Sequence, residues 1–187
     1  MKVFKRIALV GIVVAIVISG ILINQLSQAD SKVLTAWQSV TNTYAERNDA
    51  VQAVIVTAKA QPGFDANTIK ALEQALSDAR KQPPTTMLIQ DSQAFDNFKQ
   101  AQAMLTGAMY RVKAVAKASP ALSQSSEITV MNNYLDGADK NNRLDEVRKK
   151  YSETVAQYNT LTSSFPSSIF ATFLGYHPKP EFVHFAS

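Results

Sequence analysis

Few side chains in this sequence could do chemistry, and most of those lie near the C-terminus. The two histidines are His177 and His184, with Glu181 between them. A zinc site needs three or four closely arranged ligands, and metal sites in helical bundles carry Glu-x-x-His on helices, which no predicted helix here contains. The sequence has no cysteine, no Gly-x-Ser-x-Gly motif and no phosphate-binding loop. We therefore expect the histidines to lie on a surface tail, and we predict no catalytic residue, no metal, no cofactor and no enzymatic activity.

The run 143–150 is the most basic part of the C-terminal half, but acidic residues interleave it. Neighbouring opposite charges on a helix form ion pairs on a solvated face, which is the expected role of this run. Binding of acidic lipid or nucleic acid is the alternative. Aromatic side chains suited to base stacking do not cluster with it, so we expect no nucleic-acid partner. The charged residues are Arg143, Asp145, Glu146, Arg148, Lys149 and Lys150.

Arg47 occupies a position where an apolar residue is expected. Around it, apolar residues recur at heptad spacing, which predicts one buried helix seam. A charge on such a seam is costly unless it is paired. We expect Arg47 to reach the bundle edge or to pair with a carboxylate on another helix, and binding a partner is the alternative. The seam residues are Val33, Trp37, Val40, Tyr44, Val51, Val54 and Ala58.

The stretch 7–23 is the element that must position everything else. Its sequence is IALVGIVVAIVISGILI, in which twelve of 17 residues are Ile, Leu or Val. These residues favour membrane insertion by roughly 4–7 kcal/mol, and no charge occurs between Arg6 and Asp30, which leaves enough length for a bilayer core of about 30 Å. We predict a retained transmembrane anchor over 7–29 that includes the start of the first helix. The alternative is a signal peptide cleaved after Ala29.

The charges before the anchor predict its orientation. Lys2, Lys5 and Arg6 form a basic tip over residues 1–6, and the positive-inside rule places that tip in the cytoplasm. These three residues supply +3 of the formal net charge of +4, so the remaining domain is nearly neutral. We expect a single-pass protein of a bacterial inner membrane, with its C-terminal domain outside the cytoplasm.

The rest of the chain predicts an all-α fold with four helical segments over residues 30–166. No helix breaker occurs between Asn24 and Gln61, so the first helix should continue directly out of the membrane. Trp37 then lies roughly 20 Å of helix beyond the anchor, in the bundle core. Residues 85–90 should form a connection. The remaining segments run from Asp65 or Asn67 to the prolines at 83–84, from 92 to 119, and from 123 to 164 with a break near 137–142.

Each later segment has an apolar stripe that should face the core. The stripe of the second consists of Ile69, Leu72, Leu76 and Ala79, and that of the third of Phe95, Phe98, Leu105, Met109, Val112 and Ala116. The fourth segment has two stripes, which are Ile128, Met131 and Leu135, and then Leu144, Val147, Tyr151, Tyr158, Leu161 and Phe165.

Several motifs together resemble one family. Near the C-terminus they are Asn142-Arg143-Leu144, Arg148-Lys149-Lys150-Tyr151, Tyr158-Asn159, Phe165-Pro166, Ile169, Ala171, Phe173-Leu174-Gly175-Tyr176 and Pro178-Lys179-Pro180. Upstream they are Ala36-Trp37, Val40, Tyr44, Arg47, Asp49 and Ala79-Arg80. This pattern is similar to that of the LemA family over nearly the whole chain. The family's Asp-Leu-Ile-Pro-Asn-Leu run is here Asp49-Ala50-Val51-Gln52-Ala53-Val54, and the segment before Asn142 is about two residues longer.

The resemblance implies a membrane-tethered, elongated, antiparallel four-helix bundle, and it implies no reaction. Its C-terminal tail, residues 167–187, is too aromatic for a plain disordered segment. Two placements stay open for that tail. It packs at the membrane-proximal end of the bundle or enters the bilayer interface, or else it covers the bundle's own apolar side. Its aromatic residues are Phe170, Phe173, Tyr176, Phe182 and Phe185.

The absence of catalytic motifs beside an anchor favours a scaffold or adaptor for envelope proteins. The expected partners are the lipid bilayer and other membrane or envelope proteins. A module that binds or senses an unknown small molecule is the alternative, with room between the helices beside Ala101, Ala103 and Ala108. The last alternative, which the sequence favours least, is that the protein is an envelope enzyme.

Overall fold

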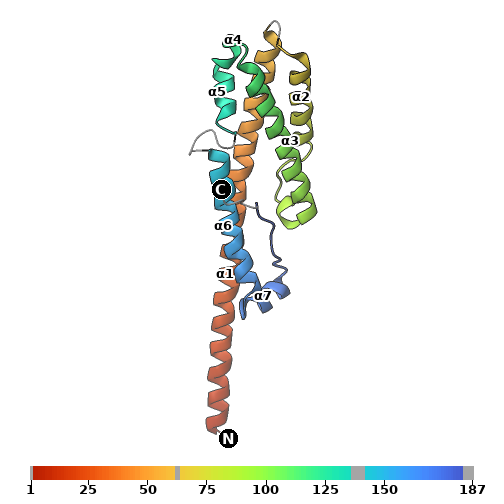
Figure 1. Cartoon of the computed structure of the whole chain (residues 1–187). Helices are drawn as coiled ribbons and strands as arrows, with labels where there is room; N and C mark the ends of the chain where they lie inside the picture. Colours follow the sequence, from red (N-terminus) through yellow and green to blue (C-terminus); the bar gives the residue numbers. More distant parts are fainter. Residues whose placement is uncertain (1, 62–63, 136–141, 183–187) are drawn as a thin grey trace.

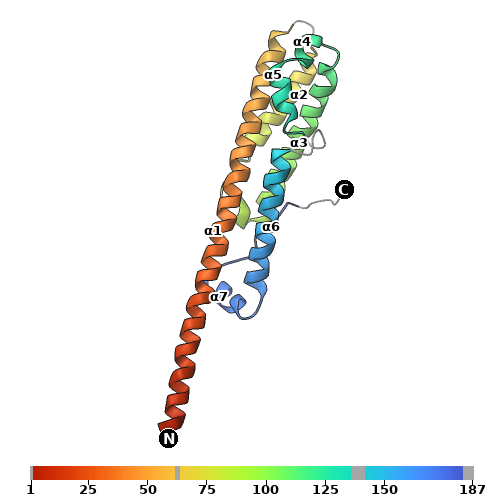
Figure 2. The ribbon, with the colours of Figure 1, turned by 90° about the vertical axis from the view of Figure 1, so that its left-hand side faces the viewer.

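The computed structural model describes residues 2–61, 64–135 and 142–182. The described chain is all-α and contains no strand, and it forms an elongated bundle (Figures 1 and 2). Its elements are α1 (Lys2–Ala60), α2 (Ala66–Arg80), the short 3-10 turn η1 (Leu88–Gln90), α3 (Ser92–Ala116), α4 (Pro120–Ser123), α5 (Ser126–Asn132), α6 (Arg143–Ser163) and α7 (Ser167–Leu174).

Helix α1 is the spine of the molecule. It contains 59 residues without a break, which corresponds to about 88 Å of helix. Helices α2, α5, α6 and α7 all pack against it. Among the described residues, α1 alone is long and apolar enough to cross a membrane, and only 6% of its most apolar window is buried. The prediction that the first helix continues from the apolar stretch into the bundle is confirmed.

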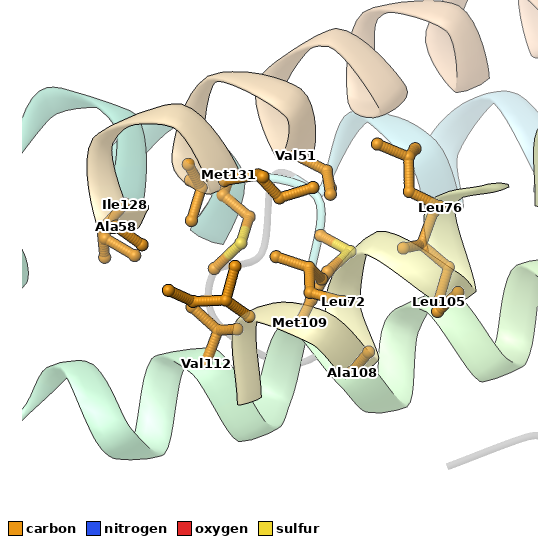
Figure 3. Packing of buried hydrophobic residues seen from close by; sticks show 14 of the residues in the cluster. Val51, Ala58, Leu72, Leu76, Leu105, Ala108, Met109, Val112, Ile128 and Met131 are labelled. Atoms are coloured by element: carbon orange, nitrogen blue, oxygen red, sulfur yellow. The ribbon is translucent and has the colours of Figure 1, made fainter. Parts of the chain in front are cut away.

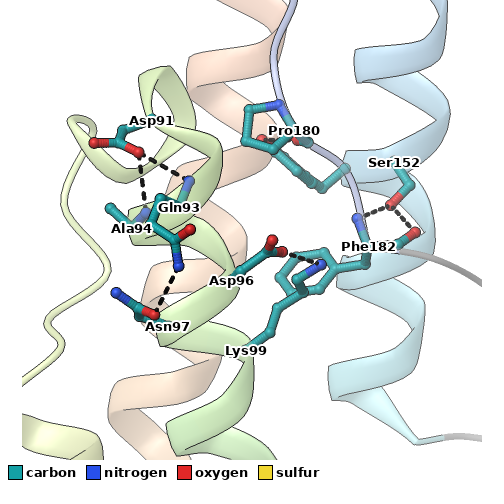
Figure 4. Close-up of polar contacts among 10 residues, drawn as sticks. Asp91, Gln93, Ala94, Asp96, Asn97, Lys99, Ser152, Pro180 and Phe182 are labelled. Atoms are coloured by element: carbon teal, nitrogen blue, oxygen red, sulfur yellow. Dashed lines mark hydrogen bonds and ion pairs between the residues drawn. The ribbon is translucent and has the colours of Figure 1, made fainter.

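Side-chain caps fix where the later helices begin. Asp65 accepts hydrogen bonds from the backbone N–H groups of Asn67 and Thr68 and so starts α2 as predicted. Asp91 accepts hydrogen bonds from Gln93 and Ala94 at the start of α3 (Figure 4). Asn142 caps α6 through Leu144 N. The connection predicted for 85–90 contains the single turn η1.

The half of the bundle farther from the N-terminus has an aliphatic core, which we call the distal core. It joins the C-terminal part of α1 to α2, α3 and α5, and Figure 3 shows how these side chains interlock. All predicted apolar residues of the second segment and of the first stripe of the fourth are buried there. Its larger members are Val51, Val54, Ile55, Leu72, Leu76, Leu105, Met109, Val112, Leu122, Ile128, Met131 and Leu135.

The predicted fourth segment is divided among α4, α5 and α6. Helix α5 packs beside the distal part of α1, and α6 lies along its proximal part (Figure 2). Because α5 ends at Asn132 and α6 begins at Arg143, the segment is interrupted where a break was predicted. Residues 137–141 of that predicted break lie outside the described residues, as do residues 62–63 and 136.

The helical phase predicted for α6 is wrong at its end. Val155 and Thr162 are buried, whereas Leu161 is half-buried and Phe165 is highly exposed. The row at 144, 151 and 158 is buried as predicted, but the second buried row lies four residues after it, at 155 and 162, and not three residues after it, at 147 and 161. Residues three and four positions along a helix both adjoin the first, so the apolar spacing alone did not distinguish the two rows. The buried positions of α6 are 144, 151, 152, 155, 158 and 162. Phe165 also lies beyond the end of α6, where its side chain leaves the seam.

Candidate functional site

The half of the bundle nearer the N-terminus has an aromatic core, which we call the proximal core. Trp37 lies at its centre, with ring centroids 5.1 Å from Tyr151, 5.8 Å from Phe95, 6.0 Å from Phe98 and 6.4 Å from Phe182. The indole N–H donates a hydrogen bond of 3.1 Å to Thr85 O, which satisfies its one polar atom. The prediction that Trp37 lies in the bundle core is confirmed.

Residues 176–182, which we call the strap, close this core. Ser152 Oγ accepts a hydrogen bond from Phe182 N and donates one to Phe182 O, both 3.1 Å (Figure 4). Asn159 Nδ2 donates to Lys179 O at 2.9 Å, and its Oδ1 accepts from Lys179 N at 2.8 Å. Both side chains therefore pair with strap backbone as a neighbouring strand would, and the strap runs antiparallel to α6.

Two further contacts hold the strap. The Tyr151 hydroxyl donates a hydrogen bond of 2.9 Å to Pro180 O. The largely buried ammonium group of Lys179 forms an ion pair of 3.0 Å with Asp30 of α1. Of the two placements predicted for the tail, Tyr176 and Phe182 follow the second, because they cover the bundle's own apolar side. The sequence offered no signal for Ser152.

Arg47 lies in the middle of the bundle with 0% of its surface exposed. Its guanidinium donates hydrogen bonds to Thr106 Oγ1 at 3.0 Å and to the side-chain oxygen of Gln102, and it lies 5.0 Å from the centroid of the Tyr44 ring. The expectation that Arg47 reaches the bundle edge is therefore wrong. Its described hydrogen bonds instead attach α1 to α3, between the distal and proximal cores.

The basic run of α6 divides between surface and interior. Arg143 forms an ion pair of 2.8 Å with Glu46 of α1. Arg148 donates to the Tyr44 hydroxyl at 2.9 Å and lies 3.3 Å from Asp145. Lys149 and Lys150 are exposed, as are Glu146 and most of Arg143. The expected ion pairs are present, but Arg148 turns toward the proximal core.

Two cavities flank Tyr158. One, of about 250 Å³, is lined by α1 residues and by α6 residues including Leu161. The other, of about 330 Å³, lies between Asp30, Gln90 and the chain from Leu174 to Lys179. The buried Tyr158 hydroxyl has no hydrogen-bond partner among the described residues. Burial and the nearby Asp30 carboxylate raise the pKa of Tyr158 to about 12, and burial likewise raises the pKa of Tyr151. Both hydroxyls therefore stay protonated at neutral pH.

The alanines expected to leave room for a ligand do not share one site. Ala108 packs in the distal core, Ala101 is half-buried and Ala103 is exposed. Neither cavity beside Tyr158 is lined by any of them. The prediction of a space between helices therefore fails at Ala103, because that side chain points away from the core.

Helix α7 differs from the strap that follows it. Its inward residues are Ser167 and Ala171, which are buried. Phe170 is half-buried. Gly175 ends the helix with φ of 77°, a left-handed conformation that glycine adopts without strain. The exposed apolar residues at α7 are Phe165 (82%), Ile169 (59%), Phe173 (87%) and Leu174 (43%), which we call the α7 face.

The remaining candidates lie apart from one another. His177 and Glu181 are exposed, and within the described residues no three His, Asp or Glu side chains lie close enough to hold a metal ion. His184 and Phe185 lie outside the described residues. Lys2, Lys5 and Arg6 belong to the first turns of α1, next to the apolar stretch. Asp49 and Pro166 are exposed.

The chain was compared with the models of known protein families and with curated proteins. The model of the LemA family matches residues 36–186 of this chain. A search of curated proteins found no significant match.

Proposed function

Because this chain belongs to the LemA family, we propose that it is a non-enzymatic scaffold or adaptor for envelope proteins, anchored by one transmembrane pass. The basic tip lies in the cytoplasm, and residues 30–187 stand outside it. The compartment is the inner membrane of a bacterium. The partners are other membrane or envelope proteins that dock on the outer surface of the bundle.

One observation carries this proposal. The exposed apolar stretch of α1 and the buried seam of the bundle belong to the same unbroken helix. A continuous helix transmits position and orientation, whereas a flexible linker would let a domain swing. The bundle is therefore held upright at a fixed height above the bilayer. This arrangement suits a protein that presents a surface to neighbours.

Orientation is tested by labelling single cysteines, because the natural chain contains none. In intact spheroplasts, Met87→Cys should react with a membrane-impermeant maleimide, and Lys2→Cys should react only after lysis. The reverse pattern would overturn the topology. Changing Lys2, Lys5 and Arg6 together to Glu should mix the two orientations, because those residues alone carry the bias.

The adaptor role is tested by photo-crosslinking in intact membranes. Asp49 is exposed and belongs to the motifs shared with the LemA family. A photoreactive residue at position 49 should capture the same membrane or envelope protein in replicate experiments. The matched control is Glu153 of α6, which is exposed and lies outside those motifs. If neither position captures a protein above background, the adaptor role fails.

The cavities beside Tyr158 favour a second candidate function, binding of a small polar molecule. A buried hydroxyl without a partner is unusual, and this one lies between two cavities near Asp30 and Lys179. A thermal-shift screen of amino acids, nucleosides and sugar phosphates tests it. A hit should raise the melting temperature of the natural chain and lose its effect in Tyr158→Phe. A screen without such a hit removes this candidate.

A further inference from the structure

Helix α7 distributes its apolar side chains in the opposite way from a helix that closes a soluble bundle. Such a helix normally turns its large apolar residues inward. Here the fully buried positions are the small Ser167 and Ala171, and Phe170 is only half-buried. The large Ile169 and Phe173 point outward. Ile169 and Phe173 are four residues apart, so they lie on the same side of the helix. The α7 face therefore needs an apolar surrounding that the bundle does not supply.

The position of α7 indicates what that surrounding is. Both views of the ribbon place α7 at the end of the bundle from which the apolar stretch of α1 extends (Figures 1 and 2). Residues 9–18 of α1 are exposed, and Leu26 is the first buried residue that the structure describes. Leu174 and Gly175 line a cavity together with Asp30. Helix α7 thus packs where α1 changes from exposed and apolar to buried.

The height of α7 matches the edge of a bilayer. Residues 7–23 of α1 span about 26 Å, close to the hydrocarbon thickness of about 30 Å. When this stretch lies in the hydrocarbon, the polar boundary falls near Asn24 and Gln25. Aromatic residues are favoured at that boundary, and short helices with one apolar face lie there in the plane of the interface. The α7 face continues the apolar surface of α1 sideways.

The charges near α7 favour insertion over electrostatic attraction. The sequence from Ser167 to Leu174 contains no charged residue. The closest basic group on the strap, Lys179, is paired with Asp30 and largely buried. Binding through this face should therefore depend on apolar contact with acyl chains and should respond little to salt or to anionic lipid.

We propose that α7 lies in the headgroup–acyl boundary of the leaflet from which α1 emerges, with Ile169 and Phe173 among the acyl chains. This inference rests on the transmembrane anchor of the proposed function. With α1 alone in the membrane, the bundle keeps its height but can still rotate about the axis of α1. A second contact, offset from α1, stops this rotation and fixes the orientation of the bundle about the α1 axis. The strap then connects the interface to the proximal core.

Tryptophan quenching in the full chain tests the proposal. Phe173→Trp is reconstituted in phosphatidylcholine nanodiscs with and without bromine on the acyl chains. We expect bromine to reduce the added emission about twofold or more, since an interfacial helix sits only 5–10 Å into the boundary. The matched control is Met104→Trp, an exposed position on α3, which should be unaffected. The natural Trp37 is buried and supplies a constant background.

Further arms separate the possible results. Ile16→Trp reports on the anchor: if it is unquenched, the transmembrane pass itself fails, and with it the proposed function. If Ile16→Trp is quenched and Phe173→Trp is not, only the placement of α7 is wrong. Blue-shifted but unquenched emission at position 173 would mean that a protein surface or a second copy covers the face, which also overturns the proposal.

Two additions make the result specific. Ile169→Asp puts a charge on the α7 face, and it should abolish quenching of Phe173→Trp while leaving the melting temperature unchanged, because residue 169 is exposed. Replacing part of the phosphatidylcholine by phosphatidylglycerol, or adding salt, should leave the quenching unchanged. Loss of quenching at high salt would show that the contact is electrostatic and would contradict insertion.

Discussion

The distal and proximal cores are built in different ways, although the same helices α1 and α3 pass through both. The distal core is mainly aliphatic, and nearly all of its buried residues come from helices. The proximal core is largely aromatic and contains no residue of α2, which ends at Arg80. The strap contributes Phe182 to this core in place of a further helix. Helix packing alone closes the first core. The second remains open until the last described residues of the chain are in place.

This difference separates two kinds of information in the sequence. Aliphatic side chains at helical spacing need only the general geometry of packed helices. The strap has no periodicity, and it is held by individual hydrogen bonds from Ser152, Asn159 and Tyr151 to its backbone. The proximal core should therefore be the more sensitive to single polar changes, and it should open before the distal core does.

The largest expected effect comes from a charge in the proximal core. Val155 is fully buried in the proximal core. An unpaired buried carboxylate costs several kcal/mol, and the free energy of unfolding of a whole domain is typically about 5–15 kcal/mol. We therefore expect Val155→Asp to unfold the proximal half of the bundle. The matched change is Leu161→Asp, at a half-buried position beside a cavity, which should cost about 1 kcal/mol or less. Denaturant unfolding measures both. Equal losses would mean that the buried face of α6 has been assigned incorrectly.

The next effect compares two phenylalanines of the tail. Phe182→Ala removes a ring that contacts Trp37, Phe95 and Tyr151 and should cost about 3–5 kcal/mol. Phe173→Ala removes an exposed ring and should cost under about 0.5 kcal/mol in detergent. Hydrogen exchange should show faster exchange at α6 in Phe182→Ala and unchanged protection at α2. Uniform loss of protection would mean that the two cores unfold as one unit.

The distal core was predictable because its signal is periodic. The spacing of Ile69, Leu72 and Leu76 is enough to define one helix face, and every residue predicted for that face is buried. The heptad seam of α1 follows from the same kind of pattern, whereas the apolar stretch before it was recognised from its length and its lack of charge. Arg47 was recognised as an exception, but its partners on α3 were not, because neutral side chains such as Gln102 carry no charge to suggest a pair.

The proximal core was only partly predictable. Trp37, Phe95 and Tyr151 could be assigned to helix faces, but Phe182 lies in a stretch with two prolines and no helical spacing. Its place depends on hydrogen bonds between groups that are distant in sequence, such as Ser152 and Phe182. The α7 face was hidden for a different reason. Nothing in its apolar pattern says that the small residues point inward.

A smaller effect is expected from the clamp that Asn159 forms on the strap. Asn159→Ala removes two hydrogen bonds to Lys179 backbone atoms, and the loss should be about 2 kcal/mol. The matched change is Thr160→Ala, because that exposed hydroxyl bonds only within its own helix. Asn159→Ala should also weaken the ion pair between Lys179 and Asp30, so adding Asp30→Asn should cost less in this background than alone. Additive losses would contradict a shared clamp.

The smallest effect is a dependence on alkaline pH. The pKa of Tyr158 is raised to about 12 by burial and by the Asp30 carboxylate, whereas an unfolded tyrosine titrates near 10. Below pH 10 the hydroxyl is protonated in both states, so its contribution to stability is fully present. Between pH 10 and 12 the unfolded chain releases the proton first, and this contribution is lost as the pH rises through the folded pKa. At pH 11 the loss should be about 1 kcal/mol, or a few degrees of melting temperature. Tyr158→Phe has no proton to release, so its melting temperature should fall less steeply over this range.

Near pH 8 the variant Tyr158→Phe should be as stable as the natural chain, because the Tyr158 hydroxyl has no hydrogen-bond partner in the described structure. Tyr151→Phe, which loses the bond to Pro180 O, should already be about 1 kcal/mol less stable at pH 8. Parallel melting curves for Tyr158→Phe and the natural chain above pH 10 would mean that the Tyr158 hydroxyl is open to water and that the strap does not seal the proximal core.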